Sequence, residues 1–151
     1  MYMLDTNICI YIIKKRPPAV QKRFESLGDV FVTVSIITFA ELQYGVEKST
    51  AGQHNQNILD AFLANVVILP WDTEAGIQYA NLRSILEEGG NLIGNMDLLI
   101  AAHALSQGAV LVTHNVREFE QIPLLHIEDW ASSQKAQVHP APAEGEKGLL
   151  P

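Results

Sequence analysis

The sequence predicts an α/β fold, in which a mainly parallel sheet of four to five strands lies between two layers of helices. Short runs of β-branched residues alternate with amphipathic stretches of helical period, which is typical of β-α units. The chain has 151 residues, of which 48 % are hydrophobic and 18 % charged. These values suit one domain with a sizeable core and exclude a disordered chain. No apolar run reaches the roughly 20 residues of a membrane-spanning helix, so no membrane contact is expected.

Five strands are expected, each a short run rich in β-branched or aromatic residues. The first ends at a carboxylate, Asp5, and the third is broken by Pro70. Because helices are expected between most of them, the strands should run parallel. The expected strands are residues 2–4, 30–34, 66–69, 109–113 and 124–127.

Six helices are expected, and most of their ends carry capping signals. Ser35 and Asp72 suit N-cap positions, and Pro17-Pro18 suits a first helical turn. Glycine follows the end of three helices, at Gly28, Gly89 and Gly108. The expected helices are residues 8–13, 17–27, 36–48, 56–64, 73–88 and 97–107.

The helix over residues 36–48 has an unusual apolar face. The i, i+3, i+4, i+7 spacing predicts an inward face of Ile37, Ala40, Glu41 and Tyr44. An acid on such a face points to a functional site. The alternative is a helix rotated by one residue, in which Glu41 faces water.

Residues 1–131 are expected to form a single domain. From residue 132 onward Ala, Pro, Glu, Gly and Lys dominate and periodicity is lost, so residues 132–151 are predicted to be a disordered tail. The single cysteine, Cys9, cannot form an internal disulfide, and the first residues lack the basic region of a secretion signal. These features predict a cytoplasmic location.

The charge balance argues against a protein that coats nucleic acid. Ten Lys and Arg against 17 Asp and Glu give a net charge of −7. Half of the cations nevertheless fall within one short segment: Lys14, Lys15, Arg16, Lys22 and Arg23. This pattern suits an acidic centre beside an edge that holds phosphate, or else a solvated helix face.

Four polar residues stand where strands end or where a helix face should be apolar. Asp5 closes the first strand, Glu41 lies on the inward face described above, Asp97 opens a helix, and Asn115 follows the fourth strand. The carboxyl ends of parallel strands form one edge, where sites of α/β folds lie. Several buried carboxylates require neutralisation, which a divalent cation with oxygen ligands provides.

Each of the four also has a purely structural reading. Asp5 suits the N-cap of the next helix, and Asp97 suits a first-turn acid favoured by the helix dipole. Asn115 suits a turn. The four residues therefore point to a function only as a set.

Three longer motifs contain these residues, in the order Met3-Leu4-Asp5-Thr6-Asn7, Ala40-Glu41-Leu42-Gln43-Tyr44-Gly45 and Ile93-Gly94-Asn95-Met96-Asp97-Leu98-Leu99-Ile100-Ala101-Ala102-His103-Ala104. A fourth stretch follows, Leu111-Val112-Thr113-His114-Asn115-Val116-Arg117-Glu118-Phe119, and then Ile127-Glu128-Asp129-Trp130. Over about residues 1–130 the ordered set resembles the PIN-domain ribonucleases. More narrowly, it resembles the VapC toxins of bacterial toxin–antitoxin pairs.

The resemblance implies a Rossmann-like PIN fold and an endoribonuclease that depends on Mg²⁺ or Mn²⁺. Asp5, Glu41 and Asp97 fall on the family's three metal-site acids, and Asn115 falls on a fourth catalytic position that is often aspartate. Asparagine carries no charge, so Glu118 or Glu120 is a candidate replacement.

The implied reaction is hydrolysis of an RNA phosphodiester at one site of a structured RNA such as transfer RNA. Thr6, Asn7 and Thr113 are expected to hydrogen-bond metal-bound water or phosphate. Arg117 and the basic segment over 14–23 are expected to hold flanking phosphates, since such contacts position a strand without reading its sequence.

The resemblance also implies a small antitoxin of the VapB type, a homodimer and a larger toxin–antitoxin assembly. We expect the antitoxin to insert a cationic residue near the acids. Its apolar contacts are expected at Ile10, Ile13, Leu42 and Val46, which suit a buried core equally well.

Two other readings compete with a nuclease. The main alternative is a catalytically degenerate PIN module that binds RNA or a protein partner without cleavage. A phosphoaspartyl phosphatase or receiver domain is disfavoured, because Asn7 stands where such a phosphatase has a second aspartate. His103 is expected to pack in the core, and the remaining histidines are too scattered to form a zinc site.

Overall fold

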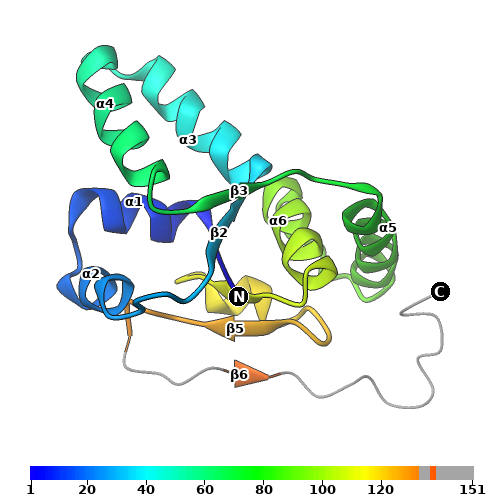
Figure 1. Ribbon diagram of the computed structural model, residues 1–151. Coiled ribbons are helices and arrows are strands. Elements are labelled where there is room, and N and C mark those ends of the chain that lie inside the picture. Colours follow the sequence, from blue (N-terminus) through cyan, green and yellow to red (C-terminus); the bar gives the residue numbers. More distant parts are fainter. Residues whose placement is uncertain (133–136, 139–151) are drawn as a thin grey trace.

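The computed structural model describes residues 1–132 and 137–138, and shows a central sheet with helices on both faces (Figure 1). The sheet has the order β3-β2-β1-β4-β5-β6, and neighbouring strands from β3 to β5 are parallel. The strands are β1 (Tyr2–Leu4), β2 (Val32–Ser35), β3 (Val67–Leu69), β4 (Val110–Val112), β5 (His126–Glu128) and β6 (Gln137–Val138). The predicted parallel α/β sandwich is confirmed.

The helices are α1 (Thr6–Lys14), α2 (Pro18–Glu25), α3 (Ile36–Lys48), α4 (Gly52–Leu63), α5 (Thr73–Glu88), α6 (Asn95–Ser106) and α7 (Val116–Phe119). The first six are the expected ones, with ends shifted by a few residues. The four-residue helix α7 was not predicted, because one turn is too short to show a period.

Strand β6 was not predicted either. It pairs antiparallel with β5 and lies within the segment 132–151 that the sequence assigned to a disordered tail. The rest of that segment, apart from Ser132, lies outside the described residues.

Two apolar clusters cover the two faces of the sheet, because successive strand residues point to opposite sides. Met3 packs with Leu98 and Ile100 on the face covered by α5 and α6. Leu4 points the other way, into a cluster with Ile8 and with residues of α2, α3 and α4.

The capping signals act as expected. The side chains of Ser35 and Asp72 accept hydrogen bonds from the backbone N–H groups of Ile37 and Ala75, at 3.1 and 3.0 Å. Gly108 follows α6 with a φ of +62°, a conformation that side chains rarely adopt.

The predicted inward face of α3 is wrong by about one position. Thr38 and Leu42 are buried, whereas Ala40 is exposed and Tyr44 is 63 % exposed. The reason is that α3 and α4 form a pair that extends beyond the sheet, so only a narrow stripe of α3 is covered (Figure 1). Glu41 lies at the edge of that stripe and is half-buried.

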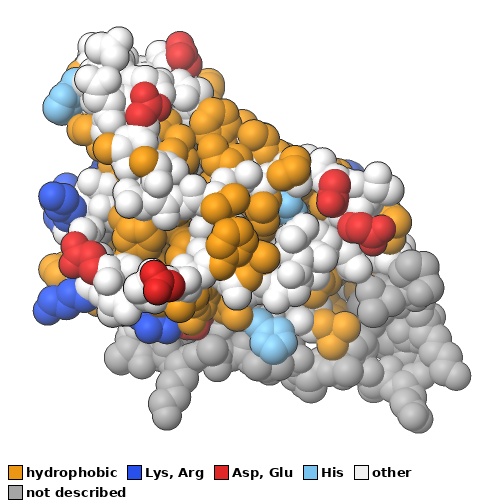
Figure 2. Space-filling model, viewed as in Figure 1, with side chains coloured by type: hydrophobic (Ala, Val, Ile, Leu, Met, Phe, Trp, Pro, Cys, Tyr) orange, Lys and Arg blue, Asp and Glu red, His pale blue; other side chains and the backbone are white. Residues whose placement is uncertain are grey.

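No helix among the described residues is long and apolar enough to cross a membrane. The edge strand β3 is only partly covered, with Val67 40 % and Ile68 37 % exposed. Figure 2 shows a band of hydrophobic side chains across this face of the molecule.

Candidate active site

Asp5 lies at the carboxyl end of β1, the central strand, and is only 4 % exposed. Its Oδ1 accepts a hydrogen bond of 2.9 Å from the backbone N–H of Ile8, so it is also the N-cap of α1. Burial raises the pKa of Asp5 to about 6, against hydrogen bonds from Thr113 and Ile8 that lower it. The nearby charges of Glu41 and Asp129 raise it further.

Glu41 reaches the same edge of the sheet from α3. Its Oε1 accepts a hydrogen bond of 2.7 Å from the hydroxyl of Thr6, the residue after Asp5. The carboxylate therefore turns toward the end of β1, although the helix phase differs from the prediction. Glu41 is half-buried, so it neither belongs to the buried stripe of α3 nor faces water completely.

Asp97 is the third residue of α6 and is half-buried. Its pKa is raised to about 7, first by burial and then by a hydrogen bond with Glu118. The charges of Glu118, Asp5 and Glu41 act in the same direction. The close approach of Glu118 thus favours the protonated form of Asp97, because two ionised carboxylates at this distance repel each other.

Glu118 is the fourth acid of the cluster. It lies on α7, which the sequence did not predict, and half-buried Asn115 stands just before that helix. Asn115 reaches the same edge, where its backbone N–H donates 2.9 Å to the hydroxyl of Thr113. The contact with Asp97 is made by Glu118, which the sequence analysis named only as a replacement candidate.

Asp129 was missed, although a sequence signal existed. It directly follows β5, is 8 % exposed, and is close enough to Asp5 to raise its pKa. Asn115 was selected because it is a polar residue that follows β4, and by the same criterion Asp129, which follows β5, is a candidate.

The remaining predicted residues divide into two groups. Thr6 and Thr113 bond to Glu41 and Asp5, as described above. Asn7 and Arg117 are exposed at the same edge of the sheet. His103 is fully buried, with Nδ1 2.7 Å from the Ser35 hydroxyl, in agreement with its predicted packing role.

The acids suit a hard divalent cation but are not drawn tightly together. Among the described residues, no three Asp, Glu, His or Cys side chains are already gathered closely enough to hold a metal. Four carboxylates at one edge nevertheless supply oxygen ligands, which Mg²⁺ and Mn²⁺ prefer. A cation there would offset the burial and repulsion that raise the pKa values of Asp5 and Asp97.

The five cations of the basic segment over residues 14–23 differ in their contacts: Arg23 bonds to other elements, and the other four are exposed. Arg23 donates hydrogen bonds of 3.1 Å to Glu128 and 3.2 Å to the Tyr2 hydroxyl, and its guanidinium lies 5.9 Å from the ring centroid of Trp130. It thereby ties α2 to the end of the domain. The other four cations are exposed, and Figure 2 shows Lys and Arg at the α2 edge with acids among them.

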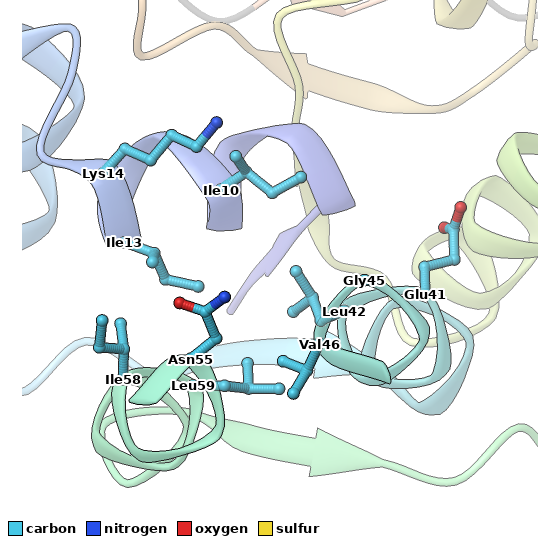
Figure 3. A pocket seen from close by; sticks show the side chains of 10 residues that line it. All are labelled: Ile10, Ile13, Lys14, Glu41, Leu42, Gly45, Val46, Asn55, Ile58 and Leu59. Carbon is cyan, nitrogen blue, oxygen red and sulfur yellow. The ribbon is translucent and has the colours of Figure 1, made fainter. Parts of the chain in front are cut away.

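A groove of about 460 Å³ lies between α1, α3 and α4 (Figure 3). Leu42 and Val46 from α3 point into it together with apolar side chains of α4, and Ile10 and Ile13 of α1 form its other side. Glu41 lies at one end, with its carboxylate turned away from the apolar side chains (Figure 3). The four residues predicted for a partner contact thus line one groove.

The sequence matches the PIN domain over residues 2–125. The chain is 46 % identical to ribonuclease VapC2 of Rickettsia felis over 131 residues, which are 86 % of this chain and 98 % of that protein. It is 43 % identical to the tRNA(fMet)-specific endonuclease VapC of Salmonella typhimurium, over 85 % of this chain and 97 % of that protein.

Solved structures agree with the sequence matches. The crystal structure of VapBC2 from Rickettsia felis, bound to a DNA fragment from their promoter, contains a chain that superimposes with a TM-score of 0.82 at 45 % identity. The match covers 85 % of this chain and 98 % of that one.

Proposed function

Because this chain belongs to the PIN-domain family, in the branch of the VapC ribonucleases, we propose that it is the toxin of a toxin–antitoxin pair and acts as an endoribonuclease. The observation that carries the proposal is the meeting of Asp5, Glu41, Asp97 and Glu118 at the carboxyl edge of the sheet. These residues come from four separate elements, and the raised pKa values of Asp5 and Asp97 mark a site built at a cost to stability.

The chain's own residues have distinct tasks in hydrolysis of an RNA phosphodiester. Asp5 is held by hydrogen bonds from the Ile8 N–H and from Thr113, so its carboxylate has one orientation. Glu41, held by Thr6, accepts a proton from the attacking water or orients that water. A cation bound at this edge would favour the ionised form of Asp97.

The proposal includes Mg²⁺ or Mn²⁺ held by Asp5 and Asp97, with Glu41 and Glu118 beside them. Such an ion supplies an activated water and offsets charge that develops at phosphorus and on the leaving 3′ oxygen. Support comes from the donor set, which consists of carboxylate oxygens, and from the electrostatic cost of the acids without a cation.

A single experiment tests this activity. Purified chain, free of antitoxin, is incubated with total bacterial RNA in Mg²⁺, in Mn²⁺ and in EDTA, beside the Asp5→Asn variant. We expect discrete fragments that require the metal and are absent with the variant. Full cleavage by folded Asp5→Asn would refute the assignment of the site, and full cleavage in EDTA would refute the metal.

The RNA substrate that we propose is a transfer RNA. The Salmonella typhimurium relative is named a tRNA(fMet)-specific endonuclease, and 43 % identity covers nearly its whole length. Sequencing of the fragment ends, with purified initiator transfer RNA as the first candidate, identifies the target. Fragments that all map to ribosomal RNA would exclude transfer RNA.

The antitoxin that we propose is of the VapB type, since the structural relatives are VapBC complexes. The groove between α1, α3 and α4 suits an apolar segment of the partner. Its end at Glu41 suits a Lys or Arg of the same segment, which would neutralise the acids and exclude RNA.

The oligomeric state and the location of the protein are also part of the proposal. From the resemblance to the VapC ribonucleases we propose a homodimer, a larger complex with the antitoxin and a cytoplasmic location. Light scattering of the purified chain and of the coexpressed pair measures both stoichiometries. A monomeric free chain would refute the homodimer without affecting the nuclease.

A further inference from the structure

His114 and Asp129 form a hydrogen-bonded contact that the reaction above does not use. The Nδ1 of His114 lies 3.1 and 3.3 Å from the two carboxylate oxygens of Asp129. The two residues directly follow β4 and β5, so both stand at the carboxyl edge of the sheet, next to the acid cluster.

The burial of Asp129 requires an explanation, because an acid here repels Asp5. Asp129 is 8 % exposed and raises the pKa of Asp5. Its Oδ1 also accepts a hydrogen bond of 2.8 Å from the backbone N–H of Ala131. The carboxylate of Asp129 fixes the imidazole, since both of its oxygens lie within hydrogen-bond distance of Nδ1 of His114.

The His114 ring is fixed on two sides and open on the others. Asp129 holds its Nδ1, and the ring of Tyr11 packs against it edge to face with centroids 6.0 Å apart. The side chain of His114 is nevertheless 52 % exposed. The His114 ring is therefore held in one orientation at the rim of the site, with one side open to solvent.

An open hollow of about 510 Å³ begins at this ring. Asn115, Arg117 and Glu120 line it together with His114 and Asp129. Its volume lies within the range of pockets that hold small organic ligands. Thr113 connects it to the acids, because its hydroxyl bonds to Asp5 and accepts the N–H of Asn115.

We propose that this hollow is a subsite for one nucleotide of single-stranded RNA, next to the phosphate that is cut. The base stacks on the imidazole of His114, and Arg117 lies where it can hold the neighbouring phosphate. Proteins read unpaired RNA in this way, by stacking bases on aromatic, histidine or arginine side chains. Asp129 acts through His114 and is a positioning residue. The inference rests on the proposed ribonuclease function and assigns part of its substrate contact.

The test is a double-mutant cycle between protein and RNA. The probe is a fluorescent single-stranded RNA that carries the mapped cleavage site, and two further probes have an abasic nucleotide on one or the other side of that site. Binding is measured in the non-cleaving Asp5→Asn background. His114→Asn keeps a donor for Asp129 and removes the ring, and His114→Phe keeps a ring for stacking.

We expect His114→Asn to weaken binding of the intact probe about five- to thirty-fold, as loss of one stacked base does. Against one of the abasic probes the same substitution should have little effect. His114→Phe should retain most of the affinity. His54→Ala, at an exposed histidine on α4, is the control and should bind like the parent.

Equal losses with intact and with both abasic probes would overturn the subsite, as would unchanged binding by His114→Asn. Melting temperatures of all variants show whether a loss reflects the fold. Cleavage of the same RNA by the Asp5 protein, measured in parallel, separates the two proposals. If the Asp5 protein cleaves normally but the effects of His114→Asn and of the abasic nucleotides on binding simply add, the subsite alone is rejected. If the Asp5 protein does not cleave the RNA at all, the function and the subsite are rejected together.

Discussion

At the residue scale, one side chain can hold a helix and serve a site together. Asp5 caps α1 and is also the most buried acid of the cluster. The structural and functional readings of its sequence position are therefore both correct. Its electrostatic environment is what separates it from an ordinary cap, whose carboxylate is solvated.

Asp5 should make the metal-free protein less stable at high pH. The folded-state pKa of about 6 lies above the ordinary aspartate value of 3.8, so the folded state binds this proton more tightly than the unfolded chain. Above pH 6 the penalty for ionised Asp5 is complete, up to about 3 kcal/mol, and it shrinks as pH falls toward 3.8. Asp5→Asn keeps an acceptor for the Ile8 N–H and removes the penalty. In EDTA it should raise the melting temperature at pH 8, and by less at pH 4.5.

Asp29 provides the matched control, because it is an exposed acid outside the cluster. Asp29→Asn should leave the melting temperature unchanged at both pH values. A lower melting temperature for Asp5→Asn at pH 8 would show that the carboxylate stabilises the fold, contrary to this account.

Glu118 should matter more for catalysis than Asn115 does. Glu118→Gln removes a charge next to Asp97, and so it should lower the pKa of Asp97 toward its usual range. It also replaces a carboxylate beside the cation with an uncharged amide, so the Mg²⁺ concentration for half-maximal cleavage should rise about tenfold or more. Glu88→Gln, at an exposed acid on α5 outside the site, is the control. A metal titration that is unchanged in Glu118→Gln but altered in Asn115→Ala would reverse the assignment.

At the element scale, α3 has two different surfaces because it packs against α4 on one side only. The side of α3 that carries Leu42 and Val46 faces the groove, whereas Tyr44 points to solvent. The helix phase therefore decides which residues meet a partner. If the phase of α3 is misassigned by one residue, residues that line the groove are assigned to the exposed side, and exposed residues to the groove.

This division predicts how substitutions on α3 affect antitoxin binding. Val46→Glu places a carboxylate in an apolar groove and should abolish copurification with the antitoxin, because an unpaired charge would be buried on binding. RNA cleavage by the variant should persist. Tyr44→Glu, on the same helix but outside the groove, should still copurify. Retention of the antitoxin by Val46→Glu would place the contact elsewhere.

At the scale of the whole molecule, an acidic protein is proposed to act on an acidic polymer. The net charge is −7, and the buried acids concentrate part of it at the edge where RNA must approach. A divalent cation offsets part of this negative charge, and a cationic segment of an antitoxin competes for the same acids. Activation of the nuclease by a cation and its inhibition by the antitoxin therefore both depend on the negative charge of the acid cluster.

Divalent cations should consequently stabilise the fold. Binding to the folded state alone adds RT ln(1 + [L]/Kd) to its stability, about 2.7 kcal/mol at a hundredfold excess over Kd. Mg²⁺ or Mn²⁺ should raise the melting temperature at pH 8, and the increase should disappear in Asp5→Asn. Calorimetric melts over a metal titration measure this. An equal increase in the variant would indicate binding outside the acid cluster.

The sequence by itself determined the alternation of strands and helices, the parallel sheet and three of the acids. These features depend on local signals: β-branched runs, the caps at Ser35 and Asp72, and acids at strand ends. Such signals act between neighbours in the chain, so they can be read without coordinates.

Only the tertiary structure decided the remainder of the site. The phase of α3, the contact of Glu118 with Asp97 and the pairing of His114 with Asp129 each join elements that are distant in sequence. Their geometry depends on how α3, α6 and α7 pack against the sheet, and packing is a property of pairs of elements. A carboxylate's neighbours, and therefore its pKa, exist only once the chain has folded.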